Sequence, residues 1–507
     1  MIKNKKRKII IGIVLFWLAS AIFSTISWAN GKFSNIDLGA ILFYIKEPLN
    51  GTNMGAFTGG ITQIVLSASL MTLIICILIW VIKPKSEIII TLWNKQFIFS
   101  LKQCRKYFIK ISLCCLILAL IYALCCIDLF GYIYNQLKAS SLYEEHYVNP
   151  QDVTLEFPEE KRNLIYIFME SMENTYMSAE EGGIEYDNFI SEMTELTYDN
   201  TNFTASKSTN GAISAYGSTW TMGAMVAQTA GIPLNLPIDG NGMENGYDIF
   251  LPGAYSIGQI LDSEGYNQVF LLGSDAIFGG RSTYMTQHGN YTLKDFCYAK
   301  NNDWIDDDYY VWWGYEDQKL YDFAKNELLN LSKEDKPFNL TLLTVDTHFF
   351  SGYFCDKCEQ NFGADQYADV ISCASRQVTE FVEWVQQQDF YENTTIVICG
   401  DHPTMDETYL QTTVVGDLDL YQRTVYTTII NSALDYELDY DRVFTTMDMY
   451  PTTLASLGVK IDGNRLALGT NLYSDTPTLV ESMGYETLNE QLQMTSKYYN
   501  KHILYAE

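Results

Sequence analysis

Four apolar runs in the second half of the chain each lead into residues that can bind a metal ion or a phosphate. The runs cover residues 163–169, 268–272, 339–345 and 394–400, and they precede Glu170, Asp275, His348 and the pair Asp401 and His402. They alternate with helical patterns, which predicts an α/β domain with a mainly parallel sheet between helices. Ligands of such sheets bind outside the carboxyl ends of the strands, so these side chains should converge. The pattern is typical of an enzyme.

Three other apolar segments are long enough to cross a bilayer, which takes about 20 residues. The first could instead be a signal peptide cleaved after Ala29, although its apolar stretch is long for that role and two further segments follow. We expect an α-helical transmembrane region with spans at 9–29, 61–82 and 111–133. The expected boundaries are 1–135 for the transmembrane region, 136–160 for a linker, 161–475 for an extracellular catalytic domain and 476–507 for a helical tail.

Charge is distributed very unevenly along the chain. Residues 1–110 contain 14 Lys and Arg against 3 Asp and Glu, whereas residues 111–507 contain 19 against 58. Basic residues precede the first span and fill the connection between the second and third. By the positive-inside rule both stretches are cytoplasmic, which places the acidic domain outside the cell. The acidic domain argues against nucleic acid as a partner, because nucleic-acid binding relies on Lys and Arg.

A loop of small residues, 206–219, separates the first two predicted strands and leads into a predicted helix. We expect Thr219 in the first turn of that helix. Unpaired N–H groups and the helix dipole favour a phosphate there, and a hydroxyl at that point is placed to attack it. The alternative is that Ser218 or Thr219 only caps the helix.

Glu170, Asp401 and His402, together with the Thr219 oxygen, form a predicted metal site. Three oxygens and one nitrogen suit one divalent cation, with Mn²⁺ as the first choice and Mg²⁺ or Zn²⁺ as alternatives. Such an ion would lower the pKa of the threonine hydroxyl and neutralise phosphate charge. Singly, each residue could be a helix cap or an ordinary polar residue. A topology that gathers all four favours the metal site.

Three of the eleven cysteines, Cys355, Cys358 and Cys373, are close in sequence within the outer domain. In an oxidising compartment we expect a disulfide between Cys373 and one of the other two. A zinc site using all three is the alternative, although the sequence offers no obvious fourth ligand nearby.

Several motifs resemble those of the lipoteichoic acid synthase and phosphoglycerol transferase family. They lie at residues 163–171, 217–219, 345–348 and 400–405, and residues 220–228 are closer to the glucan-modifying branch. The resemblance covers essentially the whole chain. It implies an outer domain with the sulfatase fold of the alkaline phosphatase superfamily, anchored in the cell membrane by the preceding spans.

The resemblance also implies roles for individual residues. Glu170, Thr219, Asp401 and His402 fall on the metal site with Thr219 as nucleophile, His348 on the phosphate-binding histidine, and Asp275 and Arg281 on the glycerol-phosphate pocket. The implied reaction moves glycerol phosphate from phosphatidylglycerol, through a glycerophospho-threonine, to a glycolipid or glycan acceptor of the cell envelope.

Two rival functions stay open from the sequence. A phosphoethanolamine transferase shares the fold, the metal and the threonine chemistry. A non-catalytic membrane protein could bind lipid head groups without turning them over. A sulfatase is disfavoured, because the chain has no Cys-x-Pro-x-Arg or Ser-x-Pro-x-Arg sequence to form the formylglycine nucleophile.

Overall fold

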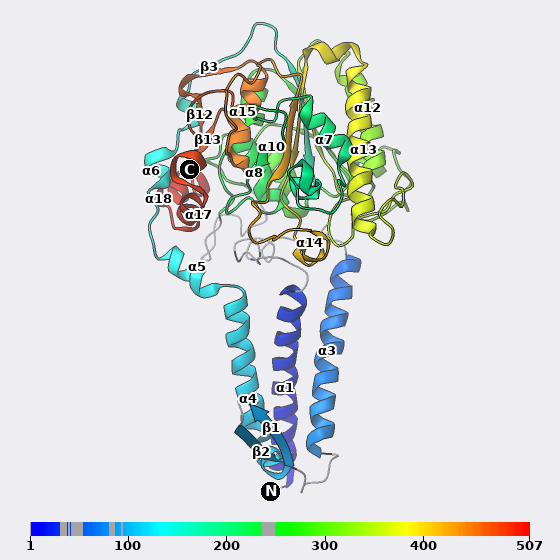
Figure 1. Ribbon diagram of the computed structural model, residues 1–507, viewed down its shortest axis with the longest axis vertical. Coiled ribbons are helices and arrows are strands. Elements are labelled where there is room, and N and C mark those ends of the chain that lie inside the picture. Colours follow the sequence, from blue (N-terminus) through cyan, green and yellow to red (C-terminus); the bar gives the residue numbers. More distant parts are fainter. Residues whose placement is uncertain are drawn as a thin grey trace. The chain divides into compact units, whose positions relative to one another are not determined.

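The computed structural model describes residues 2–30, 38, 41, 54–80, 87–92, 95–235 and 249–506 (Figure 1). These residues fall into two compact units. The first unit ends at Ile133, and all residues from Tyr134 onward belong to the second.

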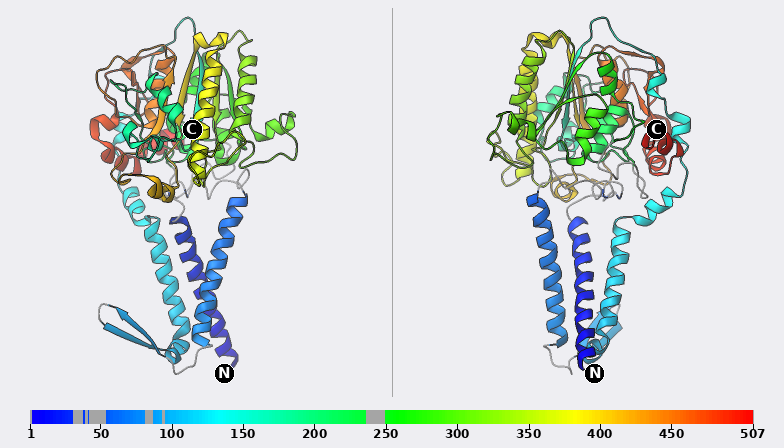
Figure 2. Two further views of the ribbon diagram at one scale, coloured as in Figure 1. Left: turned by 45° about the vertical axis from the view of Figure 1, so that its right-hand side comes forward. Right: turned by 180° about the vertical axis from the view of Figure 1, so that it is seen from behind.

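The first unit contains three long helices and a hairpin (Figure 2). The helices are α1 (Ile2–Asn30), α3 (Met54–Trp80) and α4 (Leu101–Cys126), and strands β1 (Glu87–Leu92) and β2 (Lys95–Ser100) pair antiparallel. Within the described residues, Lys6–Asn30, Thr58–Trp80 and Cys104–Cys126 are long and apolar enough to cross a membrane. The three predicted candidate spans are therefore confirmed by length and composition.

The third of these helices differs from the expected span 111–133. Helix α4 begins earlier and ends at Cys126, and Asp128 then takes a left-handed conformation with φ 44°. The Asp128 side chain accepts the Gly131 N–H at 3.2 Å inside the first turn of α5 (Leu129–Gln136). This local bond starts a new helix, so the apolar stretch is divided.

The second unit is built on a seven-stranded sheet with the order β5-β10-β9-β4-β8-β6-β7. The four strands β9, β4, β8 and β6 are mutually parallel, and β7 is parallel to β6. Strand β10 is antiparallel to its neighbour β9, and β5 is antiparallel to its neighbour β10. The strand bounds are β4 Asn163–Met169, β5 Gly211–Ala212, β6 Asn267–Leu272, β7 Thr292–Lys294, β8 Phe338–Leu343, β9 Thr394–Gly400 and β10 Val425–Ile430. The predicted mainly parallel sheet is confirmed.

The central strands are apolar on both faces because helices cover both. In β4, Leu164, Tyr166 and Phe168 enter one core cluster and the alternate residues enter the other. The first cluster is completed by α8 (Thr221–Ala230), α9 (Ile257–Ser263) and α15 (Met449–Ser456), and the second by α7 (Ser191–Tyr198), α12 (Asp317–Leu331) and α13 (Gln366–Gln386). Helices α12 and α13 lie side by side (Figures 1 and 2).

Shorter elements complete this unit. They are α6 (Leu142–His146), α10 (Arg281–Gln287), α11 (Phe296–Asn301), α14 (Glu407–Thr413), α16 (Leu479–Met483), α17 (Tyr485–Gln493), α18 (Lys497–Tyr499) and the short strands β3 (Leu155–Glu156), β11 (Lys460–Ile461), β12 (Arg465–Leu466) and β13 (Gly469–Thr470).

The expected linker, 136–160, packs as part of this unit. Leu142 and Tyr143 of α6 are 2% and 5% exposed and join the first core cluster. Strand β3 pairs antiparallel with β11. The predicted helical tail likewise packs on the core through Leu479, Leu488 and Leu492. Both terminal parts of the domain therefore contribute buried apolar surface, worth about 1.5–3 kcal/mol for each fully buried large side chain.

Candidate active site at the carboxyl edge of the sheet

Strand register brings the candidate metal ligands together. Strands β4 and β9 are parallel neighbours with Met169 opposite Gly400, so the next residues, Glu170 and Asp401, leave the sheet side by side. His402 follows at once. One donor atom from each of Glu170, Asp401 and His402 lies within 4.8 Å of the others, and the three side chains are at most 4% exposed.

The hydrogen bonds of His402 and Asp401 leave one atom of each side chain able to bind a metal ion. The Nδ1 of His402 lies 2.9 Å from the Pro403 carbonyl oxygen, which accepts its proton and leaves Nε2 with a lone pair. Nε2 lies 3.5 Å from Asp401 Oδ2 and 3.7 Å from Glu170 Oε1. Asp401 Oδ1 accepts the N–H groups of Ser171 and His402, whereas Oδ2 is buried without a hydrogen-bond partner among the described residues. A cation fits these donors.

Electrostatics favours the same conclusion. Burial, and then the charge of Glu170, raise the pKa of Asp401 to about 7. Burial lowers the pKa of His402, but the charges of Asp401 and Glu170 outweigh it and raise that pKa above its ordinary value. Two carboxylates held together away from water repel each other, and a divalent cation would offset that cost.

Thr221, and not Thr219, lies next to this group. Helix α8 begins at Thr221, and Trp220 precedes it in an extended conformation. Thr221 Oγ1 lies 3.4 Å from His402 Nε2 and 3.5 Å from Glu170 Oε2. Thr219 lies in the preceding loop, where its side chain makes no hydrogen bond to the group in the part of the chain that the structure describes.

The expectation that Thr219 falls in the first helical turn is therefore wrong. Gly217 has φ 81°, and a Cβ there would lie 2.7 Å from Pro233, so the loop turns tightly at this point. Trp220 is 1% exposed and extended, and helix α8 begins directly after it. The usable signal in the sequence was the apolar spacing of Met222, Met225 and Val226, which begins directly after Thr221.

His348 lies in the loop after β8 and within electrostatic range of the group. Its Nδ1 lies 2.7 Å from the Phe349 carbonyl oxygen, and the Trp313 ring packs at 4.8 Å between centroids. Burial, assisted by the charges of His402 and Arg281, lowers the pKa of His348 to about 4. The imidazole is therefore neutral near pH 7, with Nε2 as a proton acceptor.

Arg281 and Asp275 occupy the neighbouring loop. Arg281, the first residue of α10, is 7% exposed, and its Nε and Nη2 donate to the carbonyl oxygens of Phe278 and Asp275 at 2.9 Å. The Asp275 carboxylate instead accepts the Ile277 N–H and gathers with Asp295 and Cys297. The structure thus holds the Arg281 guanidinium rigidly, while the Asp275 side chain shapes the loop.

An ion pair supports the loop that follows His402. Glu173 accepts the Thr404 N–H at 2.9 Å and two N–H groups of Arg423 at 2.6 and 2.8 Å. Arg423 also donates to the Thr404 carbonyl oxygen. Glu173 is fully buried, and Arg423 is the cation that pairs with it.

We expect Arg423→Met to lower the free energy of unfolding by about 3–5 kcal/mol, because it leaves a buried carboxylate without its partner. Lys460→Met is the matched control, since Lys460 pairs with Glu156 on the surface and such pairs contribute about 0–1 kcal/mol. Denaturant unfolding of the detergent-solubilised protein measures both. Equal losses in the two variants would contradict the assigned role of the pair.

The comparisons with known proteins identify the family. The sulfatase family model matches residues 162–459, so the chain belongs to the sulfatase family, within the alkaline phosphatase superfamily. Phosphoglycerol transferase I of Xanthomonas axonopodis pv. citri is 29% identical over 289 residues, which are 53% of this chain and 40% of that protein. The Salmonella choleraesuis protein of that name is 28% identical, covering 50% and 32%. This chain therefore spans less than half the length of these curated relatives.

One solved structure supports the fold, and a second is similar to part of it. The lipooligosaccharide phosphoethanolamine transferase A of Neisseria meningitidis, an integral membrane protein, aligns with a TM-score of 0.51 at 12% identity, over 88% of this chain and 84% of that one. A lipoteichoic acid synthase of Listeria monocytogenes aligns with a TM-score of 0.49 at 18% identity, over 64% and 79%. The Neisseria structure confirms the predicted sulfatase-like fold, preceded in the chain by membrane helices.

Proposed function

We propose that this protein is a membrane-bound phosphoglycerol transferase that moves glycerol phosphate from phosphatidylglycerol to a hydroxyl of a cell-envelope acceptor, a glycolipid or a glycan. The relatives at 28% and 29% identity are named phosphoglycerol transferase I, a name that specifies the transferred group. The observation that carries the proposal is the Thr221 hydroxyl, 3.4 Å from His402 and 3.5 Å from Glu170 at the start of a buried helix.

In the proposed reaction Thr221 is the nucleophile. Its oxygen gives up its proton and attacks the phosphorus of the lipid, the P–O bond to diacylglycerol breaks and that oxygen takes up a proton, and glycerophospho-threonine remains. The acceptor hydroxyl then attacks that ester and releases Thr221. Glu170, Asp401 and His402 would hold one divalent cation, with Mn²⁺ as first choice, and a bound cation would lower the pKa of the threonine hydroxyl and neutralise phosphate charge.

Two further residues have supporting roles in this proposal. Neutral His348 accepts a proton at Nε2, which suits it to take the proton of the incoming acceptor hydroxyl. Arg281, held by the Phe278 and Asp275 carbonyl oxygens, would supply positive charge to the phosphate oxygens. The transmembrane helices would keep the domain, on the outer side of the membrane, at the surface that holds its lipid donor.

The lipid that supplies the transferred group distinguishes this function from its rival, phosphoethanolamine transfer. We expect the purified full chain, supplied with Mn²⁺, to release diacylglycerol from labelled phosphatidylglycerol and not from phosphatidylethanolamine. The Thr221→Ala variant, assayed in parallel, controls for contaminating lipases. Turnover of phosphatidylethanolamine alone would refute the proposed donor, and turnover of neither lipid would favour the non-catalytic alternative.

A further inference from the structure

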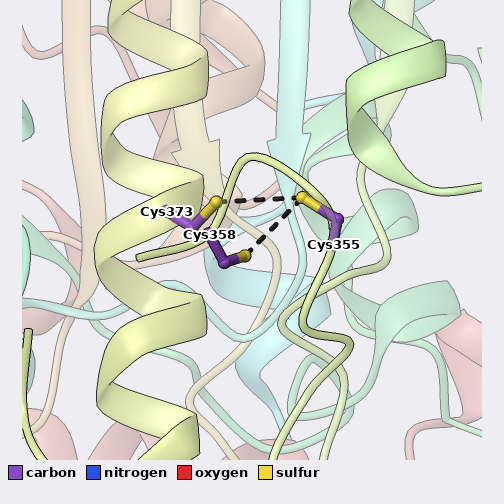
Figure 3. A group of neighbouring side chains, drawn as sticks. All are labelled: Cys355, Cys358 and Cys373. Atoms are coloured by element: carbon purple, nitrogen blue, oxygen red, sulfur yellow. Dashed lines mark hydrogen bonds between the residues drawn. The ribbon is translucent and has the colours of Figure 1, made fainter. Parts of the chain in front are cut away.

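A second cluster of potential ligands lies outside the active site. Cys355 and Cys358 come from the loop between β8 and α13, and Cys373 comes from α13, with the three sulfurs turned toward one another (Figure 3). The Sγ of Cys355 lies 3.6 Å from that of Cys358 and 3.9 Å from that of Cys373, and all three lie within 4.8 Å of one another. Cys355 and Cys373 are at most 3% exposed, and Cys358 is partly buried.

Cys355 lies among hydrogen-bond donors. Besides the two neighbouring thiols, the backbone N–H groups of Lys357 and Cys358 form hydrogen bonds to its sulfur. Thiolates are the form of cysteine that binds metals. A buried thiolate needs such donors, because burying a charge without partners is costly.

Gln377 supplies an independent observation. It is 4% exposed and lies one turn after Cys373 on α13. Its Nε2 lies 3.4 Å from Cys373 Sγ and 3.8 Å from Cys355 Sγ, whereas its Oε1 is buried without a hydrogen-bond partner among the described residues. A buried amide that directs its donor at two sulfurs, and leaves its acceptor unused, fits sulfurs that accept hydrogen bonds, as the sulfurs of metal-binding cysteines do.

We propose that Cys355, Cys358 and Cys373 bind a thiophilic cation of the Zn²⁺ type. With a zinc–sulfur distance of about 2.3 Å, tetrahedral geometry separates the ligand sulfurs by about 3.8 Å, and the two closest pairs lie at 3.6 and 3.9 Å. A disulfide joins only two sulfurs and leaves the third thiol without a role. The partly exposed side of Cys358 leaves room for a fourth ligand from solvent. Arg376 on α13 supplies positive charge beside Cys373.

Such an ion would act at a distance from the reaction. The loop that carries Cys355 and Cys358 also carries His348, and Cys373 belongs to a helix packed on the core. A shared cation therefore ties the His348 loop to α13, so that the position of the imidazole depends on both. This inference is independent of the proposed function, because it concerns ligands that take no part in the transfer.

Cobalt titration of the reduced full-length protein tests the site. Co²⁺ bound by thiolates gives a strong sulfur-to-metal charge-transfer band, which carboxylate and imidazole ligands at Glu170, Asp401 and His402 do not produce. We expect a band that saturates at one Co²⁺ per chain and disappears when Zn²⁺ is added. Cys358→Ser should abolish it, and because this thiol is partly exposed the variant should still fold. Cys297→Ser, which changes an exposed cysteine outside the cluster, should leave it intact.

A second variant and a second measurement complete the test. Gln377→Leu should weaken Co²⁺ binding by about 10–100-fold, as expected for loss of a hydrogen bond to metal ligands. Mass spectrometry of protein prepared without reductant should show bound zinc. The proposal is overturned if reduced wild-type protein gives no band, if the band survives in Cys358→Ser, or if the untreated protein contains a disulfide between Cys373 and either loop cysteine.

Discussion

Replacing Thr221 by alanine should lower the rate of glycerophosphate transfer by about four orders of magnitude or more, as loss of a nucleophile does in other enzymes with covalent intermediates. The hydroxyl lies 3.4–3.5 Å from His402 and Glu170, and no water molecule can replace an oxygen that must become covalently bonded to the phosphate. Initial rates of diacylglycerol release from phosphatidylglycerol measure the effect. Thr221→Ser keeps the hydroxyl and should retain part of the activity.

Thr219→Ala is the matched control, because it removes the same chemical group two residues away. It should keep most of the activity. Mass spectrometry of wild-type protein trapped without acceptor should place one glycerophosphate on Thr221. If Thr219→Ala is inactive and Thr221→Ala is active, the nucleophile is Thr219, as the sequence pattern predicts. The short distances from Thr221 to His402 and Glu170 then do not identify the reactive threonine.

Replacing Asp401 by asparagine should abolish transfer and also remove the stabilising effect of the metal. Without metal, Asp401 and Glu170 are buried together, and burial with the charge of Glu170 raises the pKa of Asp401 to about 7. Asparagine removes that repulsion, so the metal-free variant should unfold at a higher temperature than metal-free wild type. Mn²⁺ at a hundred times its dissociation constant should stabilise wild type by about 2.7 kcal/mol and leave the variant nearly unchanged.

Thermal unfolding in chelator and in excess Mn²⁺ measures both effects. Mn²⁺ suits this test, because it prefers oxygen and imidazole ligands to the thiolates of the cysteine cluster. Glu185→Gln is the control: Glu185 is 1% exposed, and burial raises its pKa to about 7, but it lies outside the candidate ligand group. An equal response to Mn²⁺ in wild type and Asp401→Asn would exclude Asp401 as a ligand.

The sequence by itself determined the elements that depend on local patterns. Mainly apolar runs identify β4, β6, β8 and β9, because strands buried on both faces are apolar apart from side chains that find buried hydrogen bonds, such as Asn339 of β8. Long apolar segments identify α1, α3 and α4, because a helix that crosses a bilayer needs about 20 mainly apolar residues. Since Glu170, Asp401 and His402 directly follow two of those strands, their convergence followed from the parallel topology alone.

Tertiary packing decided what local patterns leave ambiguous. Ser218, Thr219 and Thr221 are all acceptable at a helix start, and in the structure α8 begins at Thr221, directly after the buried and extended Trp220. The approach of Gln377 to two of three cysteines also depends on how α13 packs against a distant loop. Side chains far apart in sequence meet at distances that the folded core sets, and no pattern within one segment carries that information.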